Sequence, residues 1–369
     1  MVRVSERIPV LIVAGFLGSG KTTLLNRLLH DSGGTRIGVV VNDFGAVNID
    51  AMLVAGQVDA MVSIGNGCVC CAVDVGELDE MFERLTQPQA GIDVIVVEAS
   101  GLAEPRNLIR MVVGSENPRI RYGGLIEVVD AAEFPAGRER HPELVTHLRL
   151  ADLVVLNKAD RVDAAELERL RAEIVALTAP VPVYVTSFGR IDPGLLFDEP
   201  ARERTPVAGQ LSFDELWREF DRLEHSDPEH GDPEHDHRCA DGCDHPAGAH
   251  RHLHDDYTSV SFTSAQALDP RRLVSFLETP PPGLFRAKGF AEFAVHGQHR
   301  VFGLHVVGRH IVFEPRPWRP GDDRISSLVL IGAGLPAQEA LDRLRDTVHT
   351  GPDPLDEQAL LGVWRYTPH

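Results

Sequence analysis

Three groups of residues in this sequence have the types and spacing of chemical sites. The first runs from Gly15 to Thr22 and has the pattern Gly-x-x-x-x-Gly-Lys-Thr. It follows the apolar run 10–14 and precedes the amphipathic run 24–29, which predicts a strand, a glycine-rich turn and a helix. Such a turn directs backbone N–H groups toward a polyphosphate, and the helix adds the positive end of its dipole. This pattern predicts a nucleotide site.

The side chains at the end of this turn would carry its chemistry. Lys21 is expected to reach the β- and γ-phosphates, and the Thr22 hydroxyl is expected to bind Mg²⁺. Glu98 ends the apolar run 92–97 and is the expected acidic partner of Mg²⁺, so the predicted catalytic residues are Lys21, Thr22 and Glu98. The alternative is that Glu98 caps the next helix. The expected phosphate contacts are Gly15, Gly18, Ser19, Gly20, Lys21, Thr22, Thr23 and Gly101.

The second group is Asn157-Lys158-Ala159-Asp160, which follows the apolar run 153–156. In P-loop GTPases this pattern reads guanine. The aspartate accepts hydrogen bonds from guanine N1–H and the exocyclic amine, a pairing that adenine cannot make. Asn157 would hold the loop and the purine edge, and the stem of Lys158 would lie along the ring. Thr186-Ser187 would bring backbone N–H groups to the guanine carbonyl. GTP is therefore expected in preference to ATP.

The third group is the thiol cluster Cys68-x-Cys70-Cys71. Adjacent cysteines pair poorly, and a reducing compartment disfavours disulfides, so the cluster is first interpreted as a metal site. Thiolates suit Zn²⁺, with Co²⁺ and Ni²⁺ as alternatives, and three cysteines leave one tetrahedral position open. The competing interpretation is three buried apolar thiols.

A further set of side chains of metal-ligand type lies in the segment 225–256. This segment contains eight histidines, two cysteines and nine acids but only two arginines, with repeated proline and glycine. It is expected to be a loop, and metal ligation and a solvated polar linker are weighed evenly. Its candidate ligands are His235, His237, Cys239, Cys243, His245, His250, His252 and His254.

The chain between these groups alternates apolar strand-like runs with helical patterns, which predicts a mostly parallel α/β sheet of the P-loop NTPase class. The expected strands of this sheet are 10–14, 36–41, 92–97, 125–129, 153–156 and 181–185, and its clearest helices are 74–85 and 164–177. A smaller α+β domain is expected at the C-terminus, with strands 260–262, 290–295, 300–306, 310–313 and 328–331 and helices 269–277 and 336–348. The predicted organisation is a P-loop domain over 1–200, a linker over 201–256, the second domain over 257–350 and a tail over 351–369.

Composition limits the partners of the protein. The chain has 369 residues, 43% of them hydrophobic, and a net charge of −19, which argues against a nucleic-acid partner. No apolar run is long enough to span a membrane, and the start of the chain leaves no room for a signal peptide. A cytoplasmic protein is expected, and homo-oligomerisation stays open.

The order of these motifs resembles CobW-like metal-chaperone GTPases. The resemblance is carried by Gly15–Thr22, Cys68-x-Cys70-Cys71, Glu98-Ala-Ser-Gly-Leu-Ala-Glu-Pro105 and Asn157-Lys-Ala-Asp160, with Arg286-Ala-Lys-Gly-Phe290 similar to the C-terminal domain of that family. It implies slow GTP hydrolysis coupled to delivery of a metal, most often zinc, to a client metalloprotein. Relatives often have Asn-Glu-Phe-Gly-Glu where this chain has Asn42-Asp43-Phe44-Gly45-Ala46. Asp43 is thus a weaker candidate ligand.

The sequence predicts a GTP-hydrolysing metallochaperone that binds GTP, Mg²⁺ and Zn²⁺. One alternative is a zinc storage protein with a regulatory nucleotide site, which would need no metal-dependent turnover. Another is a P-loop kinase acting on a small metabolite, against which the Asn157–Asp160 motif and the thiols argue.

Overall fold

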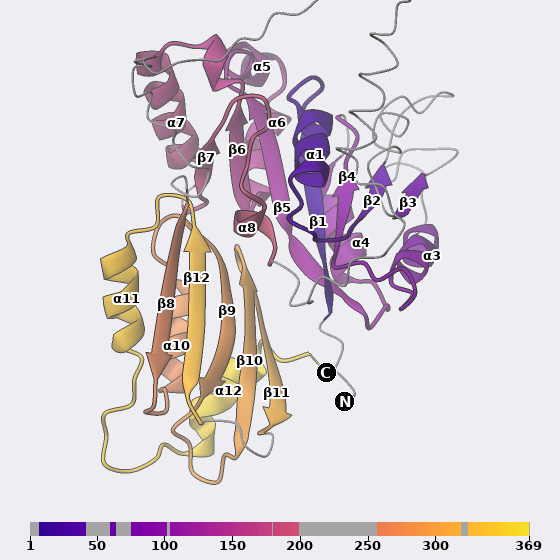
Figure 1. Cartoon of the computed structure of the whole chain (residues 1–369). Helices are drawn as coiled ribbons and strands as arrows, with labels where there is room; N and C mark the ends of the chain where they lie inside the picture. The colour runs from indigo at the N-terminus through magenta and orange to yellow at the C-terminus, as the bar shows by residue number, and fades with distance from the viewer. Residues whose placement is uncertain are drawn as a thin grey trace, which may run out of the picture. The chain divides into compact units, whose positions relative to one another are not determined.

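The computed structural model of the chain describes residues 7–41, 60–63, 75–101, 104–178, 180–198, 257–318 and 324–368. These residues form two β-sheets with associated helices (Figure 1). The stretches before residue 200 and after residue 252 belong to one compact unit. In the described part of the chain, no helix is both long and apolar enough to cross a membrane.

The first sheet has seven strands in the order β3-β2-β4-β1-β5-β6-β7, and its strand pairs are parallel. Its strands are β1 (Ile8–Gly15), β2 (Ile37–Val41), β3 (Ala60–Ser63), β4 (Val94–Glu98), β5 (Ile120–Asp130), β6 (Leu153–Asn157) and β7 (Val183–Val185). Strands β4 and β6 are buried along their whole length, as continuous apolar runs in a parallel sheet should be. The predicted α/β fold is confirmed.

Helices cover both faces of this sheet. On one face α1 packs Leu24, Leu25 and Leu28 against β1, and α8 joins the same core. On the other face, α3, α4, α5, α6 and α7 contribute to two further cores. The helical bounds are α1 (Lys21–His30), α3 (Val75–Leu85), α4 (Pro105–Val113), α5 (Phe134–Arg140), α6 (Glu143–Leu150), η1 (Ala159–Arg161), α7 (Ala164–Thr178) and α8 (Pro193–Leu196).

The register of the strands brings chemical groups to one edge. Val13 of β1 lies beside Glu98 at the end of β4, and Asp130 at the end of β5 lies beside Asn157 at the end of β6. Gly15 is the last residue of β1. Because the strands are parallel, their carboxyl ends share an edge, which is where open α/β sheets bind ligands.

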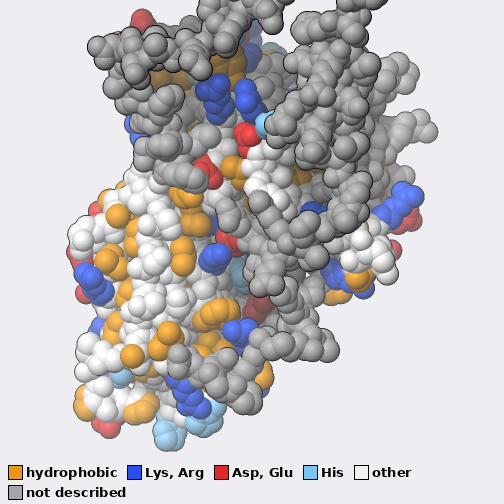
Figure 2. All heavy atoms as spheres, viewed as in Figure 1, with side chains coloured by type: hydrophobic (Ala, Val, Ile, Leu, Met, Phe, Trp, Pro, Cys, Tyr) orange, Lys and Arg blue, Asp and Glu red, His pale blue; other side chains and the backbone are white. Residues whose placement is uncertain are grey.

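The second sheet is antiparallel with the order β11-β10-β9-β12-β8. Its elements are β8 (Thr258–Ser264), α10 (Pro270–Glu278), β9 (Leu284–Glu292), β10 (Arg300–Val307), β11 (His310–Pro317), β12 (Ser326–Gly332), α11 (Ala337–Arg345), η3 (Glu357–Leu360) and α12 (Leu361–Trp364). The three α-helices pack on one face of the sheet. The other face carries the exposed residues of β8, such as Ser259 and Ser261, and Figure 2 shows scattered hydrophobic side chains over the sheet.

Two expectations for this domain need correction. The run 290–295 was expected to be a strand, whereas β9 covers Leu284–Glu292 and ends earlier. Arg286 and Lys288 interrupt the apolar pattern at its start, and both pair with Asp198. The segment after 350, expected to be a tail, forms η3 and α12, and Val363 is fully buried in the C-terminal core.

Candidate functional site

The turn between β1 and α1 requires glycine at two positions for steric reasons. Gly15 and Gly20 have positive φ values of 147° and 103°. A Cβ on Gly15 would overlap the carbonyl oxygen of Val128, and a Cβ on Gly20 would overlap the amide nitrogen of Asn157. The loop is therefore packed against the ends of β5 and β6, at a distance that only glycine permits.

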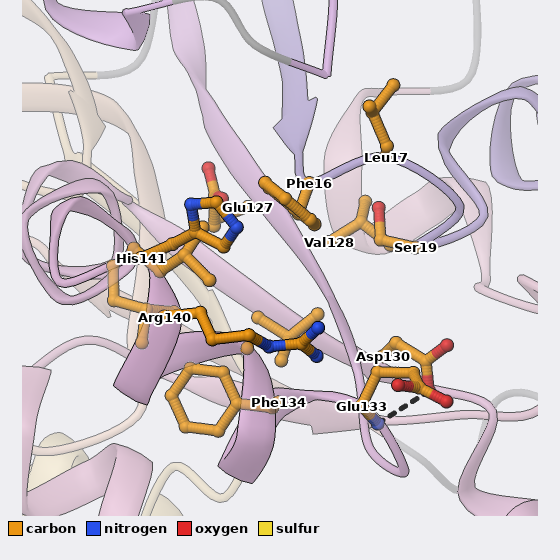
Figure 3. A pocket seen from close by; sticks show the side chains of 14 residues that line it. Phe16, Leu17, Ser19, Glu127, Val128, Asp130, Glu133, Phe134, Arg140 and His141 are labelled. Atoms are coloured by element: carbon orange, nitrogen blue, oxygen red, sulfur yellow. Dashed lines mark hydrogen bonds between the residues drawn. The ribbon is translucent and has the colours of Figure 1, made fainter.

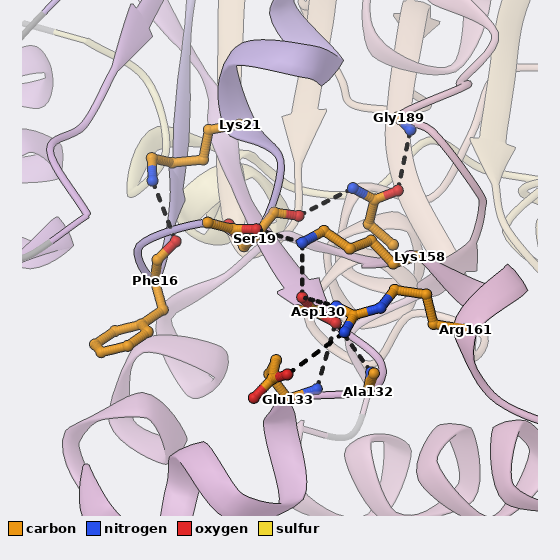
Figure 4. A network of polar contacts seen from close by, with 11 residues as sticks. Phe16, Ser19, Lys21, Asp130, Ala132, Glu133, Lys158, Arg161 and Gly189 are labelled. Atoms are coloured by element: carbon orange, nitrogen blue, oxygen red, sulfur yellow. Dashed lines mark hydrogen bonds and ion pairs between the residues drawn. The ribbon is translucent and has the colours of Figure 1, made fainter.

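Lys21 folds back over this loop. Its Nζ donates to the carbonyl oxygen of Gly15 at 3.0 Å and to that of Phe16 at 3.3 Å (Figure 4). The side chain is 8% exposed. These contacts hold the ammonium group at the start of the loop, where it can meet a bound phosphate chain.

Thr22 and Glu98 meet beside the loop. The Thr22 hydroxyl donates to Glu98 Oε1 at 2.9 Å, and Glu98 is 3% exposed. The N-cap position of the next helix, α4, is Glu104, whose side chain makes no capping hydrogen bond, so Glu98 does not occupy the capping position that was its alternative role. Hydroxyl and carboxylate oxygens are hard ligands of the kind that suit Mg²⁺, so the donor set fits the ion expected here.

Gly101 lies against the outside of the loop. A Cβ at this position would come within 2.7 Å of the Leu17 side chain and 2.9 Å of its backbone nitrogen. The backbone after β4 therefore lies close to Leu17 of the phosphate loop.

Asn157 ties three loops together. Its side chain is 1% exposed, and its Nδ2 donates to the carbonyl oxygen of Ser19 at 2.9 Å. Its Oδ1 accepts from the N–H of Gly189 at 3.0 Å, in the loop after β7 (Figure 4). One amide thus joins the phosphate loop to the loop that follows β7, and both polar ends of its side chain are satisfied.

Lys158 reinforces this connection. It has a left-handed backbone with φ 59°, and its Nζ donates to the carbonyl oxygen of Gly18 at 2.6 Å. The same ammonium forms an ion pair with Asp130 at 2.8 Å, and Arg161 contacts the same carboxylate at 3.2 Å (Figure 4). Asp130 was not predicted from the sequence, although it is the last residue of β5 just as Glu98 is the last residue of β4.

Asp160 lies at the open side of these loops. It is exposed, and its backbone N–H donates to the Ser187 hydroxyl at 3.1 Å. The N–H of Ala159 donates to the carbonyl oxygen of Thr186, also at 3.1 Å. The loops after β6 and β7 are therefore joined next to the phosphate loop. The Thr186 N–H already donates to the carbonyl oxygen of Leu156 at 2.9 Å, so Thr186 does not offer its N–H to a guanine carbonyl as the sequence predicted.

Glu127 is a second acidic residue that the sequence did not single out. It lies within β5, is 2% exposed and lines a cavity of about 290 Å³ (Figure 3). Burial raises the pKa of its carboxyl to about 8, although the nearby positive charge of Lys21 opposes the increase. An acid within an apolar strand pattern was the available signal, because charged side chains are rarely buried without a role.

The predicted transition-metal ligands lie outside the described residues. These are Asp43, Cys68, Cys70, Cys71, His235, His237, Cys239, Cys243, His245, His250, His252 and His254. Among the residues that the structure describes, no group of three or more His, Cys, Asp or Glu side chains is arranged to hold a metal. The described residues therefore include the predicted nucleotide site but not the predicted transition-metal ligands.

Two curated proteins and one solved structure are similar to this chain. The zinc chaperone CobW of a Sinorhizobium species is 28% identical over 362 residues, which cover 88% of this chain and 93% of that protein. The zinc chaperone YjiA of Escherichia coli K12 is 33% identical over 197 residues, which cover 52% of this chain and 61% of YjiA. The crystal structure of the Zn(II)-bound YjiA GTPase matches 93% of this chain and all of that one, with 21% identity and a TM-score of 0.41.

Two family models match the two folded parts of the chain. Residues 9–185 match the CobW/HypB/UreG nucleotide-binding domain, and residues 257–348 match the cobalamin synthesis protein CobW C-terminal domain. Both parts of the resemblance expected from the sequence motifs are thereby confirmed. The chain belongs to the CobW family of P-loop proteins.

Proposed function

We propose that this protein is a GTP-hydrolysing metallochaperone that binds Zn²⁺ through Cys68, Cys70 and Cys71 and releases it to a client metalloprotein under nucleotide control. The observation that carries the nucleotide part is the position of Asn157, which bonds both Ser19 of the phosphate loop and Gly189 after β7. A guanine-reading Asp160 would then lie one short loop from the phosphates.

In this proposal the residues around the phosphate loop bind and orient the nucleotide. Lys21 would pair with the β- and γ-phosphates, while Thr22 and Glu98 would hold Mg²⁺ directly or through water. The ion, when bound, would neutralise charge on the phosphates during hydrolysis. Asp160 would accept from guanine N1–H and the exocyclic amine, which selects GTP over ATP.

The metal part of the proposal is supported by sequence position and by the names of relatives. The motif Cys68-x-Cys70-Cys71 lies in the chain between β3 and α3, and β3 belongs to the same parallel sheet as β4. The chain therefore leaves β3 at the edge where Glu98 lies. Two relatives are named zinc chaperones.

Nucleotide control would arise if the GTP and GDP states position the three thiols differently. Zn²⁺ affinity would then differ between the states, and Zn²⁺ would change nucleotide affinity by the same factor. Coupling of this kind is typically about 1–3 kcal/mol, or roughly 5- to 150-fold. A zinc storage protein with a regulatory nucleotide site would show the binding without metal-dependent turnover.

The test is a Zn²⁺ competition titration in the presence of GDP or a non-hydrolysable GTP analogue, combined with GTP turnover measured with and without Zn²⁺. Replacement of Cys68, Cys70 and Cys71 by alanine should remove the tightest Zn²⁺ site, leave nucleotide affinity in the absence of Zn²⁺ unchanged, and abolish the effect of Zn²⁺ on that affinity. Replacement of Cys239 and Cys243 is the matched control and should preserve that tightest site. Equal Zn²⁺ affinities in the two nucleotide states would refute the coupling between metal and nucleotide. Absence of GTP turnover would refute the proposed GTPase activity.

A further inference from the structure

Glu127 lies directly beneath the phosphate loop without a hydrogen-bond partner for one of its oxygens. It pairs in register with Ala14 of β1, one residue before the loop begins at Gly15. Its Oε2 is buried and accepts no hydrogen bond from the described residues. A buried carboxyl in this state is costly when ionised, because burial disfavours the charged form.

The cavity beside Glu127 connects it to the phosphate loop and to solvent. Phe16 and Ser19 of the loop line the cavity, together with the end of β5, α5 and α6. The Phe16 ring contacts the His141 ring with centroids 4.8 Å apart, and the His141 side chain is 39% exposed. Figure 3 shows these two residues and Glu127 among the side chains that line the cavity. Glu127 and the partly exposed His141 therefore line the same cavity.

The other charged groups around the cavity have partners of their own. Asp130 pairs with Lys158 and Arg161, and Arg140 donates to a carbonyl oxygen of its own helix, that of Ala136. Glu133 also contacts Arg161 and lies at the exposed rim, as does His141. The charge that acts on Glu127 is that of Lys21, the residue expected to bind the phosphates.

We propose that Glu127 is a positioning residue that takes up a proton when Mg²⁺–nucleotide binds, and that it acts on the nucleotide through Lys21. This inference rests on the proposed nucleotide site but not on metal delivery. Before binding, the positive charge of Lys21 favours the carboxylate. The bound nucleotide brings net negative charge to the same ammonium, which makes the carboxylate less favourable and the neutral carboxyl more so.

Proton uptake fixes the direction of the pH dependence. The Glu127 pKa is about 8 in the free protein. The proposal requires the pKa of this carboxyl to be higher in the complex. Nucleotide then binds best at low pH, where Glu127 is already neutral. As pH rises above 8, affinity falls by up to about tenfold per pH unit until the pKa of the complex is reached. At pH 8, where half of the free protein is ionised, uptake approaches about half a proton per nucleotide.

The experiment is isothermal titration calorimetry of the full chain with Mg²⁺–GDP, repeated at pH 8 in buffers of different ionisation enthalpy. The slope against ionisation enthalpy gives the number of protons taken up. Glu127→Gln keeps the shape of the neutral carboxyl, so it should show an affinity that changes little with pH and lose the proton uptake seen in the wild-type protein. Glu133→Gln makes the same change at the exposed rim of the cavity and should behave as wild type.

The outcomes separate this inference from the proposed function. Equal proton uptake in the wild-type and Glu127→Gln proteins would overturn the inference while leaving nucleotide binding intact, whereas absence of any binding would overturn the proposed function. If Glu127→Gln does not fold, infrared difference spectroscopy of the wild-type protein decides. Release of caged nucleotide must produce a new C=O band of a protonated carboxyl, and its absence refutes the proposal.

Discussion

At the scale of single residues, Asn157 and Asp160 stand three positions apart and have different tasks. Asn157 satisfies two buried backbone groups, the carbonyl of Ser19 and the N–H of Gly189. Asp160 is exposed, and its side chain does not satisfy buried backbone groups in this way. One residue is therefore expected to stabilise the site and the other to choose the base.

Asn157→Ala should weaken the binding of all nucleotides to the same extent. It leaves two buried polar groups without a partner, which costs about 1–3 kcal/mol for each group. We expect GTP and GDP affinities to fall by about 10- to 100-fold, without any gain for ATP, and the melting temperature to fall as well. Fluorescent nucleotide titration and thermal unfolding measure both effects. A change confined to guanine nucleotides would contradict this assignment.

Asp160→Asn should change the preference among bases. The amide of asparagine offers a hydrogen-bond donor at the position where the carboxylate of Asp160 would accept from guanine. The affinity for GTP should therefore fall by at least about 100-fold, while the affinity for xanthosine triphosphate should rise. Competition between the two nucleotides measures the ratio. Asp163→Asn is the matched control, because Asp163 caps the following helix through the N–H of Glu166 and should leave base preference unchanged. An unchanged ratio in Asp160→Asn would remove Asp160 from base recognition.

At the scale of elements, α1 and β4 come from separate parts of the sequence and place Thr22 against Glu98. Thr22→Ala should reduce nucleotide affinity by about 10- to 100-fold when Mg²⁺ is present and have little effect when Mg²⁺ is chelated. Thr22→Ser keeps the hydroxyl and should restore affinity. Titrations with and without chelator supply the comparison. Equal losses in both conditions would show that the hydroxyl does not act through the ion.

The sequence was sufficient to predict these elements where local pattern and structure agree. Strands β4 and β6 are apolar throughout, and their ends mark Glu98 and Asn157. The sequence was insufficient where the role of a residue depends on contacts with a distant part of the chain. Asp130 is explained by Lys158 and Arg161, and those ion pairs depend on how β5 and β6 are aligned, which no local pattern records.

Two residues of the C-terminal domain are also buried through contacts with distant parts of the chain. The charged residues at the start of β9 break the apolar pattern, yet Arg286 is buried because Asp198 lies 2.7 Å away. Val363 looks like part of a polar terminal segment, but α12 packs it into a core formed by residues far earlier in the sequence. The periodicity of apolar residues in the sequence does not reveal burial that depends on partners far away in the chain.

At the scale of the whole molecule, buried acids make stability depend on pH. Asp152 accepts from the Tyr122 hydroxyl at 2.5 Å and from the N–H of Leu125 at 2.9 Å, and burial raises its pKa to about 6. Glu127 has a larger shift and fewer partners. The protein therefore tolerates two carboxyls that the unfolded chain would ionise more readily.

Glu127 should lower the stability of the nucleotide-free protein as pH rises. Its pKa is about 8 in the folded protein and 4.5 in the unfolded chain, so its stabilising contribution is complete below pH 4.5 and is lost as pH rises through 8. The total change is on the order of 5 kcal/mol, since each pKa unit corresponds to about 1.4 kcal/mol. Glu127→Gln has no such proton, so its stability advantage over the wild-type protein should grow with pH.

Urea unfolding of both proteins at about pH 5 and about pH 8.5, without nucleotide and with a metal chelator, measures this difference. Contributions from the other acids cancel because they are present in both proteins. Glu133→Gln, at the exposed rim of the same cavity, should follow the wild-type curve. If the free energies of unfolding of Glu127→Gln and wild type change in parallel over this range, Glu127 is already ionised at pH 5 in the folded protein. The carboxyl beneath the phosphate loop would then have no proton to exchange with a bound nucleotide.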